Sequence, residues 1–188
     1  MSRYYFFAAT LPSLQFGAPP PMPPADFLVL AARYLDGSDL GFLSSLGLGE
    51  DEELRDGPRI AARHRAWDRE VRNELVRLRA RRLGREPGTW LRGGGEASPA
   101  AAKAAQAAFQ APSPLDGELV LEGERWSLLD ALSPFQSFDL ESICAYYLKL
   151  LILERLASFG AEGGEAMYRE TYAAILGSAR TSRDIGVQ

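Results

Sequence analysis

Residues 138–159 constrain the fold of this chain most strongly, because their apolar side chains would cover almost the whole circumference of a helix. A helix that is apolar all round is buried, so this segment predicts a central core helix against which other helices pack. Ser137 or Asp139 can cap its start by accepting a hydrogen bond from a free amide of the first turn, and Gly160 ends it.

Three charged side chains interrupt this apolar segment: Lys149, Glu154 and Arg155. They argue against a membrane span, which needs about 20 mostly apolar residues. A carboxylate inside the core requires a cationic partner, and an arginine of residues 59–85 can supply one for Glu154. We therefore expect Glu154 to support the structure, either in a buried ion pair or at the rim of the core.

Residues 59–83 carry the clearest helical period in the chain. One narrow apolar stripe recurs at spacings of three to seven residues, through Ile60, Trp67, Val71, Leu75 and Leu78. The pattern predicts a long helix that ends before Gly84 and packs antiparallel on the 138–159 helix through this stripe.

The other faces of this predicted helix are basic. Residues 59–85 hold ten arginines against three acids, although the whole chain has a net charge of −4. Such a face lies on acidic parts of the same chain, faces solvent, or binds an acidic partner. Nucleic acid is a weaker alternative, because the pI is about 5.2 and Trp67 lies on the apolar stripe instead of among the arginines.

The remaining pattern predicts an all-α fold, a helical bundle with the long basic helix packed on the central apolar helix in a single domain, residues 1–188. Further helices are expected at residues 26–34, 38–46, 98–110, 126–132 and 165–179. Prolines and glycines predict linkers at residues 17–25 and 84–99. A short hairpin is an alternative within residues 115–125, and residues 4–9 fit a strand or a helix equally.

The helix expected at residues 98–110 begins at Ser98 and Pro99 and is rich in alanine. With Phe109 as its one large apolar residue, it is predicted to attach loosely to the rest of the fold. The glycines at 93–95 could place free amides around a phosphate at the start of this helix. We favour a flexible linker instead, because no strand precedes them and no Gly-Lys-Ser/Thr ending follows.

The chain offers few residues for catalysis. Cys144 and His64 are the only Cys and His residues, so no metal site, cofactor site or Cys/His nucleophile pair is expected. No nucleophile elbow, Walker motif or dinucleotide fingerprint occurs, and we do not expect an enzyme. The remaining catalytic alternative predicts a deep pocket lined by Glu154, Arg155 or His64. The single Cys and the lack of a recognisable secretion signal at residues 1–12 favour a cytoplasmic protein.

Three stretches together resemble an uncharacterised bacterial family that is encoded among the subunits of V/A-type ATPases. They are residues 4–12 (YYFFAATLP), residues 67–80 (WDREVRNELVRLRA) with the following 83–85, and residues 138–150 (FDLESICAYYLKL). The last two are similar, more distantly, to the C (or d) subunits of V-type ATPases, which form an all-helical funnel between the rotor stalk and the membrane ring. Those subunits are considerably longer than this chain.

The resemblance implies a non-catalytic, adaptor-type subunit or assembly factor of an ion-translocating rotary ATPase. Its partners would be other subunits, with no small-molecule substrate, and it would be cytoplasmic and reach the membrane only through the complex. On this hypothesis Arg69, Arg72, Arg77 and Arg79 contact an acidic partner, while Trp67 and Asn73 hold their helix in place. The alternative is a nucleic-acid-binding or regulatory helical protein that uses the arginine-rich helix at residues 59–85.

Overall fold

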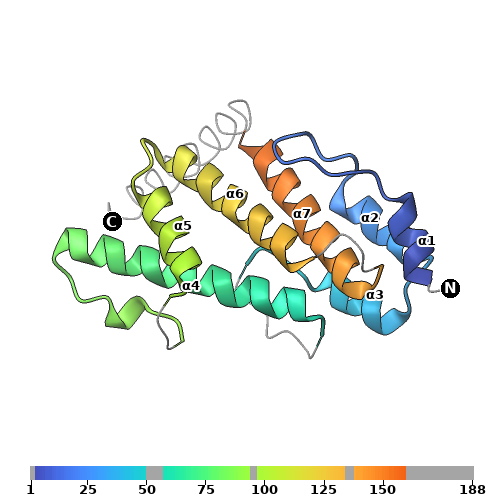
Figure 1. Cartoon of the computed structure of the whole chain (residues 1–188), viewed down its shortest axis with the longest axis horizontal. Coiled ribbons are helices and arrows are strands. Elements are labelled where there is room, and N and C mark those ends of the chain that lie inside the picture. The colour runs from blue at the N-terminus through green and yellow to red at the C-terminus, as the bar shows by residue number, and fades with distance from the viewer. Residues whose placement is uncertain (1–2, 50–56, 94–96, 134–137, 160–188) are drawn as a thin grey trace, which may run out of the picture.

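The computed structural model describes residues 3–49, 57–93, 97–133 and 138–159. These residues form seven packed α-helices and one short 3-10 turn and contain no strand, which confirms the all-α prediction (Figure 1). The elements are α1 (Arg3–Thr10), α2 (Pro24–Ala31), α3 (Gly37–Ser44), α4 (Arg59–Leu83), η1 (Gly88–Trp90), α5 (Pro99–Phe109), α6 (Pro114–Leu132) and α7 (Leu140–Ser158). The helix expected at residues 165–179 lies outside the described residues.

The helix α7 forms the centre of the main hydrophobic core, as its sequence predicts. Asp139 caps it, and the Asp139 carboxylate and the Ser142 hydroxyl each accept a hydrogen bond from the other residue's backbone amide. The helices α1, α2 and α3 pack on α7 from one side, and α6 packs from the other. Large side chains of this core are completely buried, among them Phe7, Phe27, Leu43, Leu129, Leu150 and Ile152.

A second hydrophobic cluster joins the middle of α4 to α5 and α6. Its buried members are Trp67, Val71, Leu75, Ala101, Ala104, Ala105 and Leu121. The three alanines of α5 are completely buried, so α5 is closely packed, contrary to the expected loose attachment. Small side chains anchor this helix because they let its backbone approach α4 closely, which increases dispersion contacts along the whole interface.

The hairpin considered for residues 115–125 is wrong, because these residues belong to the continuous helix α6. Ser113 caps α6 and Pro114 occupies its first turn, a combination that favours a helix start. Gly123, which lies within the helix, had suggested the turn of this hairpin. Gly117 lies against the backbone of α5, where a Cβ atom would meet the Ala108 carbonyl oxygen at 2.9 Å, so here the missing side chain permits close helix packing.

The long helix α4 packs differently from the prediction. Its main neighbours are α5 and α6, and it reaches α7 only through its first turns, where Ile60 and Ala61 join the main core. Glu141 of α7 fixes this junction, since its two carboxylate oxygens accept hydrogen bonds from the amides of Arg59 and Ile60 at 2.6 and 2.8 Å. An acid from another helix thus caps α4, an interaction that no local pattern predicts.

The N-terminal helices settle the open alternatives. Residues 4–9 are helical in α1, with Phe7 completely buried against Phe27 and Tyr34. Asp36 caps α3, which begins at Gly37, and α2 begins at Pro24, so these helices start one and two residues before the expected positions 38 and 26.

The two glycines of α6 give a matched test of this packing. Gly117→Ala should destabilise the protein by about 1–3 kcal/mol, because its methyl group would collide with backbone that cannot yield cheaply. Gly123→Ala should instead stabilise it by up to about 1 kcal/mol, because its Cβ would meet only Phe16 at 3.7 Å while the helix gains intrinsic propensity. Urea unfolding of both variants measures the two free energies, and equal signs would contradict the close α5–α6 contact.

Candidate functional site

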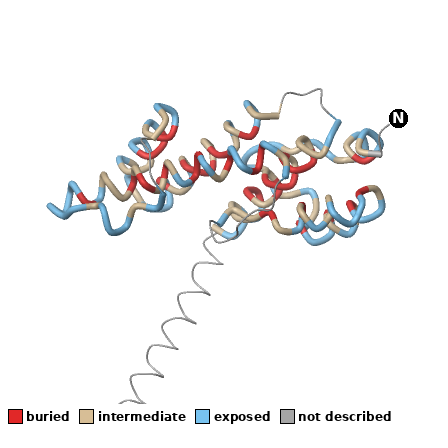
Figure 2. Tube along the Cα trace, turned by 90° about the horizontal axis from the view of Figure 1, so that it is seen from below, coloured by how far each residue is buried: buried red, intermediate tan, exposed pale blue. Residues whose placement is uncertain are grey.

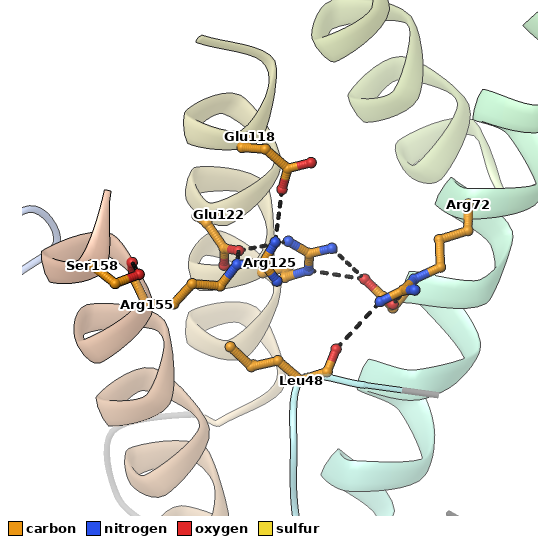
Figure 3. A network of polar contacts seen from close by, with 8 residues as sticks. Leu48, Arg72, Glu118, Glu122, Arg125, Arg155 and Ser158 are labelled. Carbon is orange, nitrogen blue, oxygen red and sulfur yellow. Dashed lines mark hydrogen bonds and ion pairs between the residues drawn. The ribbon is translucent and has the colours of Figure 1, made fainter. Parts of the chain in front are cut away.

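A network of buried charges holds α4, α6 and α7 together (Figure 3). Its centre is Arg125 of α6, which is only 3% exposed. The Arg125 Nε atom donates a hydrogen bond to Asp68 Oδ1 of α4 at 2.9 Å, and its Nη1 atom donates to Glu122 Oε1 at 2.9 Å. Asp68 and Glu122 are 4% and 0% exposed, so each carboxylate depends on the guanidinium for its compensation.

Two further arginines extend the network to its surface. Arg72 donates from Nε to Asp68 Oδ2 at 2.6 Å and from Nη2 to the carbonyl oxygen of Leu48 at 3.4 Å. Arg155 of α7 contacts Glu122 Oε1 at 3.2 Å through Nε and Glu118 Oε2 at 3.0 Å through Nη2. The three acids and three arginines balance in formal charge and connect the two hydrophobic clusters.

Burial and ion pairing oppose one another in this network. Burial acts to raise the pKa of Asp68, but the charges and hydrogen bonds of Arg125 and Arg72 outweigh it and hold that pKa below its usual value. At Glu122 burial wins over the attraction of Arg125 and Arg155, and the pKa is raised. The Glu122 Oε2 atom is buried without a hydrogen-bond partner, which is consistent with a carboxylate that is poorly stabilised in its charged form.

The only histidine lies beside this network. His64 is 2% exposed, and its Nε2 atom is buried without a hydrogen-bond partner. The pKa of His64 is lowered from 6.5 to about 4, mainly by burial; Asp68 opposes this lowering, and Arg125 and Arg65 contribute to it. The imidazole is therefore neutral at pH 7 and acts as a packed core side chain.

The four arginines predicted to bind a partner divide into two pairs. Arg72 belongs to the buried network, and Arg77 forms an ion pair with Glu74 at 3.0 Å. Arg69 and Arg79 are exposed, and no hydrogen bond or ion pair joins either side chain to another described residue. Two of the four are thus available at the surface of α4 for a partner.

The structure gives Trp67 and Asn73 clear positions in the fold. Trp67 is buried in the second hydrophobic cluster. The Asn73 side-chain amide donates to the Arg92 carbonyl oxygen at 2.8 Å, and the Asn73 Oδ1 atom accepts from the Arg92 amide at 2.9 Å. Asn73 therefore ties the segment that follows α4 back onto the middle of that helix.

Of the two positions expected for Glu154, the structure excludes the buried ion pair, because its side chain is exposed, and leaves the position at the rim of the core. The carboxylate that the arginines hold inside the protein is Glu122 of α6, which sequence reasoning missed. Glu118, Glu122 and Arg125 are spaced four and three residues apart, so they share one helix face. That spacing was a usable signal, but a hairpin at 115–125 would have separated these side chains.

The C-terminal end of α4 extends beyond the other helices at the left of Figure 1 and carries exposed arginines. We call this surface the basic end and define it by Arg79, Arg81, Arg82 and Arg85. No hydrogen bond or ion pair joins these four side chains to another described residue. Two large apolar side chains are exposed nearby, Leu83 at 68% and Trp90 at 53%. The tube in Figure 2 is correspondingly pale blue at this end.

Gly84 terminates α4 with a φ of 61°, and the Arg85 amide donates to the Ala80 carbonyl oxygen at 2.9 Å. This Schellman-type ending needs a left-handed residue, which glycine adopts without strain. The basic end is therefore a well-formed helix terminus, and its cations lie where the helix dipole favours them.

The start of α5 is already occupied by an acid of the same chain. Ser98 caps the helix, and its own amide donates a hydrogen bond to Glu70 Oε2 at 3.0 Å. The Glu70 carboxylate thus takes the place that a phosphate would take in the glycine-loop alternative, which argues against an anion site here.

Other candidate sites carry little chemistry. Glu154 and Arg155 line an open hollow of about 380 Å³ between α7 and residues 46–48, and His64 does not contribute to it. Within the described part of the chain, no group of three or more His, Cys, Asp and Glu side chains could hold a metal ion. None of the described helices is long and apolar enough to cross a membrane.

Comparison with known proteins adds no assignment: no protein-family model, no curated protein and no solved structure matches this chain.

Removal of the central guanidinium should unfold the protein readily. Arg125→Met would leave the Asp68 and Glu122 carboxylates buried without their main counter-charge, at a cost of about 3–5 kcal/mol. Arg63→Met, which removes an exposed arginine of the same helix bundle, should change stability by less than about 0.5 kcal/mol. Urea unfolding compares the two, and a loss below about 1 kcal/mol at Arg125 would contradict a stabilising role for the network.

His64 should make stability depend on pH. Because the folded protein lowers the pKa of His64 from 6.5 to about 4, the folded state prefers the neutral imidazole. This contribution is complete above pH 6.5 and is lost as the pH falls towards 4, so unfolding should become easier by about 2 kcal/mol between pH 7 and pH 5.

The His64→Gln variant isolates that effect, because Asp68 and Glu122 titrate in both proteins. Urea unfolding at pH 7, 6 and 5 should give a steeper loss of stability for the wild-type chain than for the variant. Since the chain has one histidine, an NMR titration reads its pKa directly. A value near 6.5 would show that the imidazole is not desolvated.

Proposed function

We propose that this protein is a non-catalytic, adaptor-type subunit or assembly factor of a V/A-type rotary ATPase, and that it binds an acidic surface of a neighbouring protein in that complex through the basic end of α4. One observation carries the proposal: the arginines of the basic end have no ion-pair partner among the described residues and project beyond the bundle. Arg72 and Arg77, which lie closer to the middle of α4, form ion pairs with acids of the same chain.

The composition of the basic end fits a protein–protein interface. Arginine and tryptophan are enriched among the residues that dominate binding energy, and Trp90 lies exposed beside the arginines. The helix dipole accounts for a favourable cation in the last turn, at about 0.3–1 kcal/mol, but it does not explain four arginines together with exposed Leu83 and Trp90. An acidic partner would relieve the mutual repulsion of the four cations and cover both apolar side chains.

The choice of an ATPase rests on the resemblance of the three stretches. They fall in α1 with the residues after it, in α4 and in α7, which are elements of the two hydrophobic clusters. The resemblance thus concerns residues that build the fold and, in α4, the helix that carries the basic end.

Nucleic acid is the second candidate, favoured by the same arginines. Single-strand binders combine cations with several aromatic side chains on which bases stack, and Trp90 is the one large aromatic exposed at this end among the described residues. Trp67 is buried and offers no stacking surface. An acidic protein surface therefore fits the basic end better than a phosphate backbone does.

Affinity purification from the native host tests the proposal. The tagged wild-type chain should recover subunits of the rotary ATPase. A variant with Arg79→Gln, Arg81→Gln, Arg82→Gln and Arg85→Gln should recover at least tenfold less, because the cations that meet the acidic surface are gone. Arg59→Gln with Arg63→Gln is the matched control, since both arginines are exposed at the opposite end of α4.

Two outcomes would contradict this function. Recovery of the wild-type chain as a monomer without any other ATPase component would remove the assignment to the complex. Equal recovery by the four-site variant would remove the role of the basic end. Titration with a DNA duplex over a salt series addresses the second candidate, because phosphate contacts give an affinity that falls steeply as salt rises.

A further inference from the structure

A second exposed surface lies at the other end of the molecule, where α1 meets the start of α7 (Figure 1). Three large aromatic side chains are exposed there: Tyr5 at 45%, Phe6 at 53% and Phe138 at 44%; a fourth, Phe16 at 40%, lies against α6. Tyr5 packs edge-on against both Phe6 and Phe138, with ring centroids 5.9 and 4.7 Å apart. Phe16 packs in the same way on Trp126 at 5.6 Å.

Phe138 and Trp126 line a groove of about 480 Å³ between α1, α6 and α7, and Tyr5 and Phe16 pack on these two rings. We call it the aromatic groove. Its apolar lining includes Leu11, Leu14, Trp126, Phe138, Ile143 and Ala145. The Tyr146 hydroxyl donates to the Pro12 carbonyl oxygen at 3.0 Å, which holds the segment after α1 along one side. A volume of this size accommodates one or a few large side chains of a bound chain.

The described residues that line the aromatic groove have no net charge. No charged residue occurs between positions 4 and 25, which supply one whole side of it. Its lining contains one cation and one anion, Lys149 and Asp130, and these two form an ion pair with each other. Lys149 also lies over the ring of Trp126, 5.1 Å from its centroid. A charged partner would lose its hydration here and gain no counter-charge.

We propose that the aromatic groove binds an uncharged, apolar segment of a partner protein, which inserts one or more large side chains between α1, α6 and α7. The chain would then join two partners of opposite character, an acidic surface at the basic end and an apolar segment at the aromatic groove. This second surface does not depend on which complex the basic end serves.

A protein segment fits the observations better than a bilayer does. Binding to a membrane surface relies on cations that attract anionic lipids as well as on apolar side chains, and the rim from position 4 to 25 contains no cation. A recess lined on three sides by helices offers most of its apolar area to a side chain that enters it, whereas a flat lipid surface would contact only the four exposed rings.

Site-specific photo-crosslinking in the native host tests the proposal on the full chain. A benzophenone analogue of phenylalanine replaces Phe16 at the groove, and in the control it replaces Val29, which is 64% exposed on α2 away from the groove. We expect the Phe16 position to crosslink to a segment of another protein that mass spectrometry identifies as uncharged and apolar. The Val29 position should give at least tenfold less of that product.

Substitutions then link the crosslink to the groove itself. In the chain labelled at position 16, Phe138→Glu should reduce the crosslink at least tenfold, because it places a charge on the rim of an uncharged site. Val29→Glu, the matched change of an exposed apolar residue, should leave it unchanged. Circular dichroism melting checks that both variants fold, and Tyr5→Glu, at the ring that packs on Phe138, provides a second variant should Phe138→Glu melt early.

Several results would overturn the proposal. These are a crosslink to lipid, to a second copy of this chain, to residues 160–188 of the same chain, or to a charged segment, and a yield no higher than at position 29.

Loss of ATPase recovery in the Arg79, Arg81, Arg82 and Arg85 variant with an intact crosslink at position 16 would separate the two surfaces. The failure of either proposal is thus distinguishable from the failure of the other.

Discussion

The bridge from Asp68 through Arg125 to Glu122 is the interaction on which the rest of the structure depends. Two desolvated carboxylates are tolerable only because one guanidinium reaches both, and this requirement fixes α4 and α6 in a single register. Arg72 and Arg155 extend the same constraint to the segment after α3 and to α7. In a purely hydrophobic interface of equal area, α4 and α6 could shift along one another more easily. The network therefore fixes how the two helices align where the two hydrophobic clusters meet.

This use of arginine inside the fold determines which arginines remain for function. Residues 72 and 125 neutralise internal acids, and Arg77 pairs locally with Glu74. Arg79, Arg81, Arg82 and Arg85 have no such role; they lie where α4 runs past the other helices, and none of them forms an ion pair with a described acid. The aromatic groove lies between α6, α7 and α1 with the uncharged residues that follow α1. Two surfaces of different chemistry suit a protein that connects others.

Much of the fold could be predicted from the sequence. The caps Asp139 and Ser98, the termination at Gly84 and the apolar circumference of α7 all act within a few residues, so their effects are readable along the chain. The errors occurred where tertiary contacts override local preference. Gly123 looked like the turn of a hairpin but lies within the continuous helix α6, and the alanines of α5 looked weakly anchored but pack tightly on α4.

The sequence by itself determined that this chain is helical, that residues 140–158 lie in its core and that residues 59–85 are strongly basic, because helix formation and burial follow from local spacing. Only the tertiary structure decided that Glu122 and not Glu154 is the buried acid, that Arg72 is held in the ion-pair network while Arg79 is exposed, and that α1, α6 and α7 leave a groove. Ion pairs and grooves depend on which side chains meet across space. Helical periodicity shows which residues share one face of a helix, but it does not show which other helix that face packs against.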